Sequence, residues 1–76
     1  MKNTESLLNE LYELRIRGQF LDRATPLERD HYHRDRLGLL DALRHEGYTG
    51  RIDGDDINTA ILFTEHTREE NALKIE

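Results

Sequence analysis

The chain has no cysteine and no tryptophan, and it has one proline, three tyrosines and two phenylalanines. Without cysteine, the fold is held neither by disulfides nor by a zinc site with thiolate ligands. The apolar runs are too short to span a membrane, which excludes a transmembrane helix. Residues 1–5 lack the hydrophobic stretch of a signal peptide. We therefore expect a protein of the cytoplasm that makes no membrane contact.

The chain is also short and poor in apolar residues. Its 76 residues predict a single helical domain, 1–76, whose thin core buries only a modest fraction of the surface. Apolar and charged residues each make up 36% of the sequence, but the apolar ones recur periodically, unlike those of a disordered chain. Small domains without disulfides or metals often gain burial by association. We therefore expect a homodimer.

Positive charge is scarce in the last third of the sequence. The formal net charge of the chain is −5, and residues 51–76 hold three Lys/Arg against seven Asp/Glu. A negative chain repels nucleic acid, so DNA or RNA binding would need a local basic patch. The acidic third could instead dock on a basic protein surface. The charge therefore favours another protein over a nucleic acid as the partner.

The first periodic segment predicts a helix over residues 5–17, because leucines recur in it at helical spacing. Gly18 follows directly and is typical of the position just after a helix. Phe20 and Leu21 come next, in a short connection. We expect these two apolar side chains to fold back against the core.

The second segment predicts a long central helix, about 26–46. Thr25 and Glu28 form a capping-box pattern, in which each side chain accepts a hydrogen bond from the backbone amide of the other residue. Pro26 suits the first helical position, where its missing amide hydrogen is not needed. Gly47 then favours the end of the helix.

The segment that follows is less clear. Residues 48–54 are rich in turn formers, and Asp53-Gly54 could close a small hairpin. Asp53 or Asp55 is expected to cap a third helix. A second capping-box pattern begins at Thr67, so this helix could break there into two.

One face of the third helix carries the apolar positions Ile57, Ala60 and Ile61, together with Thr64. Residues 59–64 also form a short apolar run, and periodicity alone does not distinguish a strand from a helix there. The predicted fold is therefore all-α, a small bundle of three helices, or four if the last breaks near Thr67. The alternative is an α+β fold with a short strand near 59–64.

The central helix changes character along one face. With 100° per residue, its leucines share a sector with arginine, tyrosine and histidine nearer its start. Those cationic and aromatic side chains either lie along the edge of a small core or form a contact surface, since Tyr and Arg are enriched in binding hot spots. The predicted protein-binding residues are Arg29, Tyr32, His33 and Arg36. A second candidate surface comprises Glu65, Glu69 and Glu70, which could meet the arginines of a second subunit.

Catalytic and metal-binding patterns are incomplete. On a helix, His31 with Asp35, or Asp41 with His45, supplies only two ligands, whereas a metal site normally needs three or four. Ser6 is the single serine and has no base near it in the sequence. We expect no enzymatic activity, no cofactor and no bound metal.

These observations together predict a binding function. The expected protein is a non-enzymatic protein-binding module, a small regulator, adaptor or inhibitor that acts through a helical surface as a homodimer. The alternative is a dimeric nucleic-acid-binding regulator that uses the Arg/His face of the long helix. The identity of the protein partner does not follow from the sequence.

Overall fold

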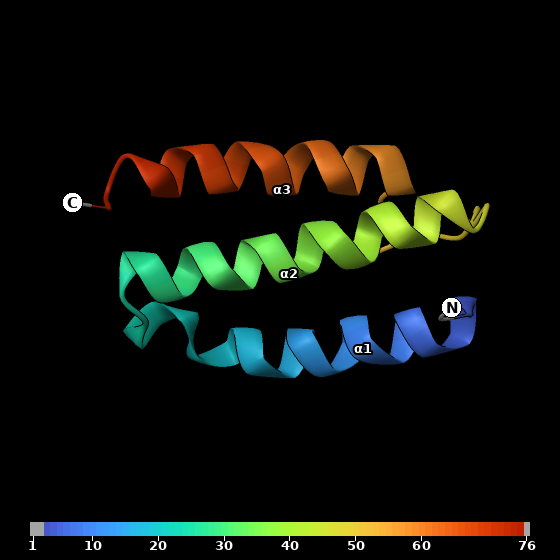
Figure 1. Ribbon diagram of the computed structural model, residues 1–76, viewed down its shortest axis with the longest axis horizontal. Coiled ribbons are helices and arrows are strands. Elements are labelled where there is room, and N and C mark those ends of the chain that lie inside the picture. Colours follow the sequence, from blue (N-terminus) through green and yellow to red (C-terminus); the bar gives the residue numbers. More distant parts are fainter. Residues whose placement is uncertain (1–2, 76) are drawn as a thin grey trace.

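The computed structural model describes residues 3–75, and within this range the chain forms three antiparallel α-helices (Figure 1). They are α1 (Thr4–Arg17), α2 (Pro26–His45) and α3 (Ile57–Ala72), with a short 3₁₀ helix, η1 (Gly18–Arg23), after α1. The long helix α2 lies between the other two (Figure 1). The predicted all-α bundle is confirmed.

Asn3 caps the start of α1, and its side chain accepts a hydrogen bond from the Ser6 amide at 2.8 Å. The helix ends at Gly18, as predicted, but this glycine keeps a right-handed conformation and the chain continues directly into η1. A Cβ atom at Gly18 would lie 2.6 Å from the Tyr32 hydroxyl, so the glycine permits a close approach to α2. The prediction that Phe20 packs on the core is wrong, since its side chain is 66% exposed.

The helix α2 begins with the predicted capping box. The Thr25 hydroxyl accepts from the Glu28 amide, and the Glu28 carboxylate accepts from the Thr25 amide, both at 3.2 Å. These hydrogen bonds hold the pKa of Glu28 below its ordinary value. Gly47, with φ +80°, follows the helix in the left-handed conformation that favours glycine.

The connection from α2 to α3 contains a tight turn. Ile52 and Asp55 exchange backbone hydrogen bonds of 2.7 and 3.0 Å around Asp53 and Gly54, which have φ of 52° and 89°. The predicted hairpin is thus reduced to one residue pair. The cap of α3 was predicted at Asp53 or Asp55 but is Asp56, because both earlier residues belong to the turn. The Asp56 carboxylate accepts from the Thr59 amide at 2.7 Å, which lowers its pKa.

The helix α3 is continuous, so the alternative of a strand near 59–64 is wrong, and no break occurs near Thr67. Instead of capping a new helix, Thr67 donates its hydroxyl hydrogen to the Phe63 carbonyl at 2.9 Å. None of the helices in the described part of the chain is long and apolar enough to cross a membrane.

The apolar core occupies one end of the bundle, where the start of α1, the end of α2 and the start of α3 meet. Its buried members are Leu7, Leu11, Leu40, Leu43, Ile52, Ile57, Ala60 and Ile61.

The other end of the bundle is held largely by polar contacts. The buried Asp30 carboxylate accepts from Arg34 and Arg68, each at 3.2 Å. The buried Asn71 donates to the Pro26 carbonyl at 2.8 Å and so attaches the end of α3 to the start of α2. The two ends are therefore stabilised by different kinds of interaction.

Candidate functional site

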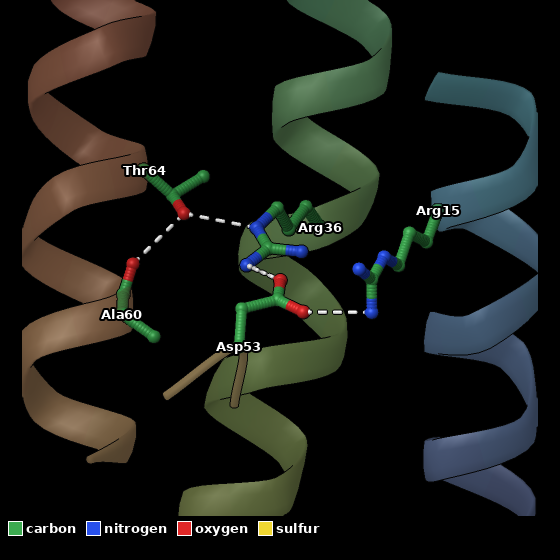
Figure 2. A network of polar contacts seen from close by, with 5 residues as sticks. All are labelled: Arg15, Arg36, Asp53, Ala60 and Thr64. Carbon is green, nitrogen blue, oxygen red and sulfur yellow. Dashed lines mark hydrogen bonds and ion pairs between the residues drawn. The ribbon is translucent and has the colours of Figure 1, made fainter. Parts of the chain in front are cut away.

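Arg36, on the predicted arginine face of α2, contacts both α3 and the connection that precedes it. Its side chain is only 15% exposed. The Nε group donates to the Thr64 hydroxyl at 3.2 Å, and the Thr64 hydroxyl donates to the Ala60 carbonyl at 2.8 Å. Figure 2 shows this path from α2 to α3. Arg36 is therefore positioned by hydrogen bonds where the apolar contacts of Leu40 end.

A single carboxylate joins Arg36 to α1. The Oδ2 atom of Asp53 lies 3.3 Å from Nη2 of Arg36, and its Oδ1 atom lies 3.0 Å from Nη1 of Arg15. Figure 2 shows Asp53 reaching from the connection to both guanidinium groups. The Asp53 and Arg15 side chains are partly exposed, and such ion pairs add little stability in water. The main effect of these ion pairs is to hold Arg15 and Arg36 next to each other.

A groove of about 250 Å³ lies beside this network, above α2 and between α1 and α3. The rim is apolar at Phe63, whose side chain is 68% exposed. A second hollow of about 220 Å³ continues it along α1 past Tyr12 and shares the two arginines and Asp53. The groove is lined by Arg15, Tyr32, His33, Arg36, Asp53, Phe63, Thr64 and Thr67. Three of the four residues predicted on α2 thus line one hollow.

The positive charge of this groove comes from arginine rather than histidine. His33 is half-buried and packs edge-on against Tyr32, with ring centroids 5.5 Å apart. Burial lowers the pKa of His33, Arg36 and Arg29 lower it further, and Asp30 opposes them. The imidazole is therefore mostly neutral at pH 7 and lines the groove as an uncharged aromatic ring.

Arg29, the fourth predicted residue, lies outside the groove. Its Nε group donates to the Leu21 carbonyl at 2.8 Å, and its Nη2 group donates to the Asp22 carbonyl at 3.3 Å. These carbonyls belong to η1. Arg29 therefore fixes the connection between α1 and α2.

The second predicted surface lies elsewhere. Glu65 and Glu69 line a separate groove of about 630 Å³ between α2 and α3, together with Arg34 and Arg68. Glu70 pairs with His66 at 2.8 Å. Helical spacing places Glu65 and Glu69 on the flank of α3 opposite Phe63 and Thr67, whereas Glu70 falls on the same flank as Phe63. Glu65 and Glu69 are thus separate from the arginine groove, and the structure does not bring the three predicted glutamates together on one surface.

Sequence reasoning missed Arg15, Asp53 and Phe63 as members of the site. Arg15 lies in the same sector of α1 as Leu8 and Leu11, which was interpreted as core only, and Asp53 was interpreted as a helix cap. The signal available for Asp53 was the Asp-Gly pair, because a turn there presents the aspartate side chain to neighbouring elements.

No family model, curated protein or solved structure matches this chain. Within residues 3–75, no three His, Asp or Glu side chains are grouped so as to hold a metal ion. The groove's own chemistry is therefore the basis for inferring a function.

Proposed function

We propose that this chain is a non-enzymatic protein-binding module, a small regulator, adaptor or inhibitor that receives a segment of another protein in the groove between α1 and α3. The observation that carries the proposal is the exposed Phe63 ring beside Arg15 and Arg36. A large apolar surface next to fixed hydrogen-bond donors is typical of protein-binding hot spots. Tyr32, also of a type enriched in hot spots, lines the same groove.

The charge distribution supports a protein over a nucleic acid. The chain carries a net charge of −5. Asp53 lies within the groove, and Asp30 is close enough to His33 to influence its pKa. A polyanion would meet repulsion from these carboxylates over several phosphates, whereas a protein segment can present one complementary charge.

A matched pair of variants tests the proposal. Phe63 and Leu62 are neighbours on α3 with similar exposure, 68% and 65%, but Leu62 does not line the groove. Tagged protein is used to capture binding partners from an extract of the native host. We expect Phe63→Ala to lose the partner and Leu62→Ala to retain it. Equal retention by the two variants, with both folded, would contradict a role for the groove.

The homodimer expected from the thin core is a separate proposal. A two-fold pair requires that each surface face the partner copy at the same time. The arginines line the groove on the Phe63 side of α3, whereas Glu65 and Glu69 lie on its opposite side, which favours a different protein as the occupant of the groove. Sedimentation equilibrium at low and high salt tests the dimer, because contacts between arginine and glutamate weaken as salt rises.

A further inference from the structure

Asp53 occupies the position that a partner's carboxylate would take, if the groove binds protein as proposed above. We infer that the partner is an acidic segment, in which one aspartate or glutamate displaces Asp53 from Arg15 and Arg36 while a neighbouring apolar side chain packs on Phe63. The chain's own carboxylate thereby acts as a built-in competitor for the site.

The hydrogen bonds of the two arginines leave room for a better acceptor. Asp53 contacts each guanidinium through one oxygen, and the 3.3 Å distance to Arg36 exceeds that of a strong charge-assisted bond. Among the described residues, Nη1 of Arg36 and both Nε and Nη2 of Arg15 have no hydrogen-bond partner. A carboxylate that enters from the groove can use these free donors and pair with a guanidinium through both oxygens.

Asp53 can leave the arginines without unfolding the turn. The turn is closed by backbone hydrogen bonds between Ile52 and Asp55, which do not involve the Asp53 side chain. That side chain is 43% exposed, so water can solvate the carboxylate once it rotates away. Displacement therefore requires rotation of one side chain and no rearrangement of the helices.

The local charge is opposite in sign to that of the whole chain. Arg51 lies beside Arg15 and Arg36 in the adjoining hollow and donates to the Gly54 carbonyl at 2.8 Å. Three arginines and one carboxylate, that of Asp53, therefore line the two hollows, and Arg51 also lies close enough to Asp56 to lower the pKa of that carboxyl. When the Asp53 side chain rotates away from Arg15 and Arg36, these two arginines are left with an excess of positive charge, which complements an acidic segment.

The test uses a random peptide library displayed on phage and selected against the full chain. The strongest peptide is then measured by fluorescence anisotropy against the native protein, Asp53→Asn and Asp55→Asn. Asparagine tolerates the left-handed conformation at position 53. Asp55→Asn is the matched control, because it changes the net charge equally in the same turn and the Asp55 side chain makes no hydrogen bond or ion pair within the described residues.

We expect the selected peptides to contain aspartate or glutamate next to a leucine or an aromatic residue. Asp53→Asn should bind the strongest peptide about fivefold more tightly, the upper range for loss of one competing ion pair in water. Asp55→Asn should bind like the native protein. Replacing the peptide's acid by its amide should weaken binding by about tenfold, as expected for loss of a charged hydrogen bond.

The contrary outcomes separate this inference from the proposed function. Peptides that need Phe63 but bind Asp53→Asn and Asp55→Asn equally would overturn the acidic partner and leave the groove as a protein-binding site. Peptides that bind Phe63→Ala as well as the native protein would contradict both. Displacement of the peptide by a single-stranded DNA oligonucleotide at the arginines would overturn the inference in favour of the nucleic-acid alternative.

Discussion

The two halves of α2 use the same face in different ways. In its C-terminal half, residues 37–45, Leu40 and Leu43 are fully buried in an apolar cluster that includes side chains of α1, α3 and the connection between α2 and α3. In its N-terminal half, residues 26–36, Arg29 and Arg36 reach the neighbouring elements through directed hydrogen bonds. Apolar contacts fill space in any orientation, whereas hydrogen-bonded side chains hold elements together without filling the space between them. The groove lies beside the N-terminal half.

The largest expected effect comes from the C-terminal half. Leu43→Ala removes a fully buried side chain and leaves a cavity, so we expect a loss of roughly 2–5 kcal/mol in the free energy of unfolding. Urea denaturation followed by circular dichroism measures it. Leu62→Ala, at an exposed leucine of α3, serves as the control and should change stability by less than about 0.5 kcal/mol. Similar losses in the two variants would show that the core is not at this end.

The polar contacts that support the N-terminal half should give a smaller effect. Asn71→Ala removes the side-chain hydrogen bond that joins the end of α3 to the Pro26 carbonyl in a part-buried position, and we expect a loss of roughly 1 kcal/mol. The same denaturation experiment applies, with the exposed Asn58 of α3 replaced by alanine as the control. A loss equal to that of the control would mean that water replaces Asn71 at no cost.

The helix cap should contribute no more than this. Thr25→Ala removes the acceptor of the Glu28 amide, which should cost about 1 kcal/mol. The loss of stability should be concentrated at the start of α2. Amide hydrogen exchange should therefore become faster there but not at Leu40. Thr49→Ala, in the exposed connection, should leave exchange unchanged. Faster exchange throughout α2 would instead mean that its two halves open as one unit.

The smallest effect concerns pH. Because burial holds the pKa of folded His33 below its ordinary value of 6.5, the unfolded chain takes up this proton first as the pH falls. The contribution of neutral His33 to stability is complete above about pH 6.5 and is lost as the pH falls through the pKa of the folded state. His33→Gln should therefore lose less stability than the native protein between about pH 7.5 and about pH 5. Equal losses for the two proteins, measured by urea denaturation at both pH values, would contradict a lowered pKa for His33.

Local signals predicted much of the fold. The Thr25–Glu28 capping box and the stop at Gly47 lie where the sequence indicates, because both depend on contacts between near neighbours. The cap of α3 was misplaced by one residue or more, since the turn that includes Asp53 and Asp55 is settled by pairing with Ile52. Helical periodicity could not show that the run at 59–64 is helical, because a strand could bury the same residues.

The site was only half predictable for a related reason. The angular positions of Tyr32, His33 and Arg36 follow from helix geometry alone, so their common surface could be anticipated. Arg15 and Phe63 join them only because α1 and α3 pack on either side of α2. Arg29 shares their sector but is bound to carbonyls of η1, whose path the sequence did not indicate.

The most direct test of the groove is an NMR titration of ¹⁵N-labelled protein with the strongest peptide from the library. The groove predicts that the largest amide shifts fall on Arg36, Phe63, Thr64 and Thr67. Amides beside Leu43, in the other half of α2, should remain nearly unchanged. Shifts concentrated around Glu65 and Glu69, with the groove residues unchanged, would contradict the account.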